Sequence, residues 1–260
     1  YKDSALISGE EHAACLKTAG EKNEIHSNLW ITQVNDDRTA RQFTSGDKDS
    51  HGRWSPDGQR IAFTSVRNKR QPQIFVLESE GGEARALTSF PEGTIGAWAW
   101  SPDGKSLAVS FRETDADRTE AAEARREETG GSTPPWEIED LFYRLDGDGY
   151  FGSSRFRLFL VDAETGAHRL LFARGSAPSF SFDWSPDSSE LLVATNVSRE
   201  PLLTPWKDAL FRVDAASGRV KRIAGLPEGW KSAARYSPDG SRLLFAGREG
   251  RETWGVRNTL

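Results

Sequence analysis

The sequence predicts an all-β fold, a β-propeller built from four-stranded antiparallel blades. Three observations support this prediction: an aromatic-led turn motif occurs four times, second hairpins follow it, and aromatic side chains compensate for a low apolar content. Of the 260 residues only 36% are hydrophobic, but 9 Trp and 14 Phe supply large buried surfaces. A core of aromatic and β-branched residues suits sheets better than a helix bundle.

The repeated motif combines an aromatic residue, Ser-Pro-Asp-Gly and an alternating apolar run. Its copies are Trp54–Thr64, Trp100–Ser110, Trp184–Ala194 and Tyr236–Ala246. Proline presets φ at the first central turn position, Ser can cap the turn, and Gly supplies the left-handed residue. The motif therefore predicts a hairpin whose first strand ends at the aromatic residue. Ser188 replaces Gly in the third copy, which should cost about 1 kcal/mol if the left-handed conformation is kept.

Second hairpins are predicted in three repeats, each with a Gly-containing turn between two apolar runs. The runs are Gln73–Leu77 with Ala84–Leu87, Arg157–Val161 with His168–Phe172, and Ala209–Val213 with Val220–Ile223. Two hairpins make the four strands of a propeller blade. Asn28–Thr32 and Thr39–Thr44 match the third and fourth strands of a further blade. Residues 1–260 therefore predict a partial propeller of about five blades, the first and last incomplete, within a whole of roughly seven or eight.

An insertion at about residues 113–150 interrupts one blade. Its first part, Glu113–Glu128, is dense in Ala, Glu and Arg and predicts a surface helix or disorder. The segment Gly130–Pro135 is predicted to be a loop. Asp146–Gly149 lacks the ligand spacing of a calcium loop and predicts a tight turn. Long insertions in repeat proteins are often functional, and a mobile decoration is the alternative.

The chain shows no pattern of a catalytic, metal or cofactor site. It lacks the Gly-x-Ser-x-Gly nucleophile elbow, and its histidines have no zinc-type spacing. We expect these histidines to be structural or exposed; they are His12, His26, His51 and His168. The net charge of −5, from 39 acidic and 34 basic residues, argues against nucleic acid as a partner. The adjacent cations Arg125-Arg126 and Lys221-Arg222 are predicted to be solvated surface.

Cysteine usage and apolar runs bear on cellular location. Cys15 is the single cysteine, so an internal disulfide is excluded and a cytoplasmic location is expected, with a periplasmic or secreted one left open. Cys15 itself is expected to be a small buried hydrophobe. No apolar run reaches the roughly 18 residues of a membrane span. The chain has no methionine and stops at Thr253–Leu260, where another strand is expected, so we expect further blades outside it.

A more specific signal lies in Ile138–Phe151, which is followed by the strand Arg157–Asp162. A Tyr-Arg, Asp-Gly-x-Gly-aromatic segment before a strand ending in Val-Asp, within Ser-Pro-Asp-Gly repeats, resembles the acylaminoacyl-peptidase and dipeptidyl-peptidase branch of the prolyl oligopeptidase family. Glu21–Glu24 before Asn28–Ile31 is also similar to the first blade of that branch. The resemblance covers nearly the whole chain, although its distinctive part is short.

The resemblance implies a serine peptidase whose propeller admits short peptides and excludes folded proteins by size. The catalytic Ser, Asp and His then belong to a C-terminal α/β-hydrolase domain that is missing from this chain, so the chain alone is expected to be inert. Some relatives bind the substrate's amino terminus with propeller carboxylates, and Glu137 and Glu139 are the candidates here. Solvated acids on a loop are the alternative. The expected partners are a short peptide and the hydrolase domain, without cofactor, nucleic acid or membrane, and homo-oligomerisation is left open.

Two other functions are compatible with the repeats. Non-catalytic Tol-Pal-type propellers, which bind proteins, share the Ser-Pro-Asp-Gly motif but are not expected to carry the Asp-Gly-x-Gly-Tyr segment. A free-standing propeller enzyme with a site in its central channel, such as a glycosidase or lyase, is the third hypothesis, because paired carboxylates cannot be identified from sequence.

Overall fold

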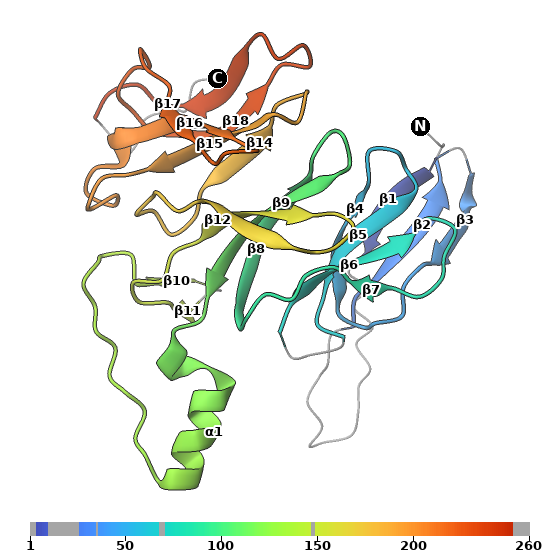
Figure 1. Cartoon of the computed structure of the whole chain (residues 1–260), viewed down its shortest axis with the longest axis horizontal. Coiled ribbons are helices and arrows are strands. Elements are labelled where there is room, and N and C mark those ends of the chain that lie inside the picture. Colours follow the sequence, from blue (N-terminus) through green and yellow to red (C-terminus); the bar gives the residue numbers. More distant parts are fainter. Residues whose placement is uncertain (1–3, 10–25, 35, 68–70, 147–148, 252–260) are drawn as a thin grey trace. The chain divides into compact units, whose positions relative to one another are not determined.

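The computed structural model describes residues 4–9, 26–34, 36–67, 71–146 and 149–251 (Figure 1). The positions His12, Cys15, Glu21–Glu24 and Thr253–Leu260, to which predictions above refer, lie outside the described residues. The chain divides into two compact units. The first comprises residues 1–91, 104–106 and 162–167, and the second comprises the remainder.

The first unit contains two antiparallel sheets whose strands follow sequence order. The three-stranded sheet consists of β1 (Ser4–Gly9), β2 (Asn28–Gln33) and β3 (Asp36–Gln42). The four-stranded sheet consists of β4 (Asp49–Trp54), β5 (Arg60–Ser65), β6 (Gln73–Glu78) and β7 (Arg85–Ala86). The two predicted N-terminal strands are thus present as β2 and β3, and β1 is an addition. Leu29 packs with Ile61, Phe63, Phe75 and Leu77 in the core of this unit.

The second unit contains the insertion, two four-stranded sheets and a two-stranded sheet near the end of the described chain. One consists of β8 (Gly93–Trp100), β9 (Ser106–Glu113), β12 (Arg157–Asp162) and β13 (His168–Phe172). The next consists of β14 (Ser181–Trp184), β15 (Glu190–Asn196), β16 (Asp208–Asp214) and β17 (Val220–Arg222). The last pair is β18 (Lys231–Tyr236) with β19 (Leu243–Gly247). Strand β15 is buried at every position after Glu190, as expected for a central strand covered on both faces.

The four motif aromatics occupy the same register in their sheets. Each ends the first strand and lies opposite the aliphatic residue that opens the apolar run of the second strand. The pairs are Trp54 with Ile61, Trp100 with Leu107, Trp184 with Leu191, and Tyr236 with Leu243. The prediction of equivalent hairpins and of an all-β propeller fold is confirmed. The total number of blades stays a prediction.

The Ser-Pro-Asp turns share one hydrogen-bond pattern. In every copy the Ser hydroxyl donates to the Asp carboxylate, and the distances are 2.6 Å for Ser55–Asp57, Ser101–Asp103 and Ser185–Asp187 and 2.5 Å for Ser237–Asp239. The fourth turn residue is left-handed, with φ of 71° at Gly58, 70° at Gly104, 63° at Ser188 and 71° at Gly240. Ser188 therefore keeps the left-handed conformation expected of Gly, which is the condition under which a cost was expected.

The insertion leaves the sheet after β9 and returns at β12. It begins with a short 3₁₀ turn (Ala116–Arg118) and the helix α1 (Glu120–Thr129), so the predicted surface helix is present. The Thr119 hydroxyl caps this helix by accepting from the Ala122 N–H at 3.2 Å, and Gly130 ends it in a left-handed conformation. No residue of α1 is buried. No helix of the described residues is long and apolar enough to cross a membrane.

Two short strands, β10 (Arg144–Leu145) and β11 (Gly149–Tyr150), form a hairpin near the end of the insertion. Leu145 pairs with Gly149, so Asp146 stands at the turn between them. Residues 147–148 of the predicted Asp146–Gly149 turn lie outside the described residues. A further 3₁₀ turn, Pro205–Lys207, precedes β16.

Candidate functional site

The strand directions divide each four-stranded sheet into two chemically different ends. First and third strands run toward one end, and second and fourth strands run back. The Ser-Pro-Asp turns and the second hairpin turns share the first end, which we call the turn end. The connections from second to third strand and from one sheet to the next share the other, the loop end. Of the described residues in the second unit, 114–146, 149–156, 173–180, 197–207 and 223–230 form the loop end.

Exposed apolar side chains gather at the loop end of the second unit. Six of the nine large hydrophobic residues that are exposed in the described part of the chain belong to its two second-to-third-strand connections. They are Ile138, Leu141, Tyr150, Val197, Leu202 and Leu203. Exposed apolar side chains concentrated in one region favour a contact surface over a purely solvated loop.

Stacked aromatic rings organise the insertion. The Arg118 guanidinium lies 3.4 Å from the centroid of the Trp136 ring, and Trp136 stacks on Tyr150 with centroids 5.6 Å apart. Tyr143 adds a third ring, 5.9 Å from Tyr150. Cation–π contact and offset stacking each contribute about 0.5–1.5 kcal/mol. A cavity of about 330 Å³ opens beside Arg118, Trp136 and Tyr150.

The two predicted substrate carboxylates lie next to this cluster. Glu137 and Glu139 are exposed on either side of Ile138, and neither lines the cavity beside Trp136. Asp140, the third acid of the run, is taken up by Arg155, whose guanidinium donates to it at 2.8 Å. The role of Glu137 and Glu139 as ligands of a peptide amino terminus stays a prediction. The solvent exposure of both side chains is its structural support.

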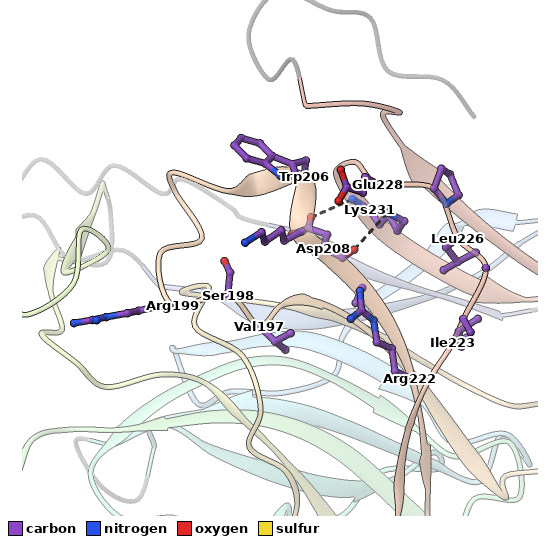
Figure 2. A pocket seen from close by; sticks show the side chains of 15 residues that line it. Val197, Ser198, Arg199, Trp206, Asp208, Arg222, Ile223, Leu226, Glu228 and Lys231 are labelled. Carbon is purple, nitrogen blue, oxygen red and sulfur yellow. Dashed lines mark hydrogen bonds between the residues drawn. The ribbon is translucent and has the colours of Figure 1, made fainter.

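A cavity of about 660 Å³ lies between the two connections that flank β16 and β17 (Figure 2). Its wall includes apolar groups from Val197, Trp206, Ile223 and Leu226. Charged residues complete the wall: Arg199, Lys207, Asp208, Arg222, Glu228 and Lys231. A cavity of this volume, with apolar and charged groups in its wall, is in the range that holds a small ligand or a few peptide residues.

Two oppositely charged residues in the wall of this cavity, the buried Lys231 and the half-buried Asp208, are linked by hydrogen bonds. Lys231 is only 4% exposed, and its ammonium donates to the carbonyls of Gly229 at 2.9 Å and Asp208 at 3.3 Å. The Asp208 carboxylate accepts from the Lys231 backbone N–H at 3.0 Å and from Asn196 at 2.9 Å. Burial lowers the pKa of Lys231 and raises that of Asp208, since removal from water disfavours both charges.

A third cavity, of about 410 Å³, connects the insertion with the neighbouring sheet. Phe142 of the insertion lines it together with Pro201 and Pro205 of the next second-to-third-strand connection and Trp230. The insertion therefore lies beside the loops around Lys231, which lines the same cavity.

Sequence reasoning missed Trp206, Asp208 and Lys231 and placed Arg222 on solvated surface. Arg222 is indeed exposed, but it faces a cavity. A usable signal was present: Leu202, Leu203 and Trp206 are apolar residues in a connection between strands, where polar residues are expected.

Comparison with known proteins finds a peptidase among the proteins that are similar to this chain. No family model matches it. It is 33% identical over 182 residues to the uncharacterized peptidase YuxL of Bacillus subtilis, which covers 68% of this chain and 26% of that protein. The chain is a β-propeller that resembles part of a peptidase. The resemblance to the prolyl oligopeptidase family is thereby confirmed.

Two other comparisons describe the breadth of the fold. The Pyrococcus horikoshii acylaminoacyl peptidase superposes on 96% of this chain with a TM-score of 0.65 and 16% identity, over 35% of its own length. The Tol-Pal system protein TolB of Alcanivorax borkumensis is 31% identical over 97 residues, 32% of this chain and 22% of that protein. The chain thus spans about a quarter of the length of YuxL and of this TolB.

Proposed function

We propose that this propeller gates the access of short peptides to the active site of a serine peptidase. The catalytic Ser, Asp and His belong to an α/β-hydrolase domain outside the chain, and the propeller excludes folded proteins by size. The observation that carries the proposal is the 33% sequence identity to a peptidase, which extends over two thirds of the chain and through the insertion-bearing region. The exposed apolar residues and cavities of the loop end support its use as the surface that meets peptide.

The test is to label the intact protein with a fluorophosphonate, which reacts with activated serine nucleophiles. We expect covalent labelling that heat denaturation abolishes, and cleavage of short peptides but not of the same sequences within a folded protein. Absence of labelling, or equal cleavage of a folded protein, contradicts the proposal.

The carboxylates Glu137 and Glu139 extend the proposal to the substrate's amino terminus, because an ammonium needs an anionic partner. The double variant E137Q/E139Q should raise KM about tenfold for peptides with a free amino terminus. N-acetylated peptides should be unaffected, and E127Q/E128Q on the exposed face of α1 is the matched control. An equal KM for both peptide forms leaves these residues as solvated acids.

A second candidate function is protein binding without catalysis, supported by the sequence similarity to TolB. In that case the intact protein forms no fluorophosphonate adduct and cleaves no peptide, while its loop end still binds a protein partner.

A further inference from the structure

The cavity of Figure 2 carries more positive than negative charge, although the chain as a whole is acidic. Four cations line it, against the two carboxylates of Asp208 and Glu228. Glu228 is already engaged by Arg251, whose Nε lies 3.0 Å from its carboxylate. The Asp208 carboxylate is engaged by Asn196 and by the Lys231 backbone. Both carboxylates in the wall therefore already have an ion-pair or hydrogen-bond partner.

Arg222 is the cation best placed for a ligand. Figure 2 shows its guanidinium directed from β17 toward Asp208 and Lys231. Within the described residues it forms no ion pair. Burial is the main cause of the lowered pKa of Lys231, the Asp208 charge opposes it, and the charge of Arg222 lowers this pKa further. Two like charges side by side, one of them buried, are relieved by an anion between or beside them.

The form of the anion follows from the rest of the wall. Trp206, Ile223 and Leu226 give the cavity an apolar side next to the guanidinium. A carboxylate joined to an apolar group satisfies both sides, whereas inorganic phosphate or a polyphosphate leaves the apolar side uncovered. A guanidinium binds a carboxylate through two parallel hydrogen bonds, which is stronger and more directional than a lysine contact.

We propose that this cavity binds a peptide carboxylate, held by Arg222, with an adjacent apolar side chain against Trp206 and Ile223. The proposal rests on the proposed function, of which it names a substrate contact. Lys231 fixes the backbone beside the site, because its ammonium donates hydrogen bonds to the Gly229 and Asp208 carbonyls. The carboxylate comes either from the carboxyl terminus of the peptide or from an acidic side chain within it.

The test is calorimetric titration of the intact protein after treatment with a serine-directed fluorophosphonate, so that turnover does not interfere. The probes are N-acetyl-Ala-Ala-Phe as the free acid, the same peptide as its amide, and N-acetyl-Ala-Glu-Phe amide. We expect the free acid or the Glu peptide to bind at least about tenfold more tightly than the neutral amide. Whichever of the two binds more tightly identifies the source of the carboxylate.

The variant R222Q should remove this preference, and K221Q is its matched control. Lys221 precedes Arg222 on the same exposed strand, carries the same charge and does not line the cavity. R222K should retain a part of the preference, because it keeps the charge and loses the two-bond geometry. Melting curves of the variants report whether each is folded.

Equal binding of acid and amide overturns the proposal, as does a preference that survives in R222Q. Either result leaves the peptidase proposal untouched, because labelling by the fluorophosphonate is scored separately. Conversely, a carboxylate preference in a protein that takes no label removes the peptidase proposal and keeps the binding site.

Discussion

The turn end and the loop end of the sheets contrast sharply in chemistry. At the turn end four copies of one motif form the same Ser-to-Asp hydrogen bond, within 0.1 Å of one another, between 2.5 and 2.6 Å. At the loop end equivalent positions differ even in charge. The buried first residue of β4 is Asp49, whereas the buried first residue of β18 is Lys231. The turn end is fixed by the fold, and the loop end is free to carry function.

Asp49 and Lys231 show how a blade tolerates either charge at one position. Asp49 pairs with Arg67 and accepts from the Gly46 N–H at 3.1 Å. Lys231 donates to two backbone carbonyls instead. Each buried charge has local hydrogen-bond partners, although in Asp49 they reach only one of the two carboxylate oxygens. The backbone register is preserved while the surface chemistry changes.

The largest expected effect comes from the aromatic core at the turn end. Trp184→Ala should lower the free energy of unfolding by about 3–5 kcal/mol, because a 7% exposed ring leaves a cavity in the main core cluster. Trp206→Ala, in the loop-end cavity, should cost about 1 kcal/mol or less and weaken peptide binding. Chemical denaturation measures both, and equal losses of stability would remove the distinction between the two ends.

The second effect tests whether the loop-end cavity has a fixed shape. A Cβ at Gly229 would lie 1.6 Å from the Arg248 carbonyl oxygen, whereas a Cβ at Gly225 meets nothing within 4 Å. Both have positive φ, so Gly225→Ala should cost about 1 kcal/mol from backbone strain. Gly229→Ala should cost about 2–3 kcal/mol, because the loop must also move. Thermal melting of the two variants measures both losses of stability. If Gly229→Ala costs no more than Gly225→Ala, the loop at Gly229 moves easily to accept a Cβ atom.

The sequence was sufficient for the turn end because its information is local. The order Ser-Pro-Asp-Gly sets the turn, and the next residues alternate, so Trp54 and Tyr236 could be assigned to strand ends without tertiary data. Strand β1 was missed because Ser4–Gly9 mixes small and apolar residues without a strong period. Ser188 was interpreted correctly, since the motif around it overrides its own preference.

The loop end could not be predicted because its residues are brought together by tertiary structure. Val197, Arg222 and Lys231 come from three segments, and no spacing in the sequence relates them. The acids Glu137, Glu139 and Asp140 looked alike in sequence, and only the position of Arg155 separates the paired Asp140 from the other two. Distinguishing a solvated Arg222 from one that faces a cavity likewise requires coordinates.

A smaller effect compares two copies of the turn. Gly240→Ser gives the fourth copy the residue of the third, and should cost about 1 kcal/mol because φ is 71° there. The nearest atom to a Cβ at this site is 3.6 Å away in Pro186, so backbone strain accounts for the cost. Ser188→Gly should change stability by less than about 0.5 kcal/mol. Relief of strain is offset by greater freedom of the unfolded chain and by loss of the Ser188 hydroxyl that accepts from the Asp103 N–H at 3.0 Å.

The midpoints of urea unfolding measure the stability changes of Gly240→Ser and Ser188→Gly. A Ser188→Gly protein that gains as much as Gly240→Ser loses would mean that the Asp103 contact contributes nothing.

The smallest expected effect is the change in folding stability at acidic pH. Protonation of the carboxylates discussed below changes this stability in opposite directions at the turn end and at the loop end. Hydrogen bonds from Ser185 and Ser189 lower the pKa of Asp187 to about 2, and those from Ser237 and Ser241 do the same for Asp239. These folded-state values lie below the ordinary value of 3.8, so the carboxylates stabilise the fold above about pH 4 and lose that contribution as pH falls toward 2. Both groups are exposed, which keeps the effect small.

At the loop end burial raises the pKa of Asp208, so its protonation on acidification removes a destabilising charge. The variant D187N/D239N should therefore be less stable than the wild type at pH 7 and show a shallower loss of stability between pH 4 and 2. D208N should instead steepen the net loss over the interval in which Asp208 takes up its proton, because the compensating gain is gone. Urea midpoints across this pH series test both signs, and parallel slopes for the wild type and both variants would show that neither end senses acid through these carboxylates.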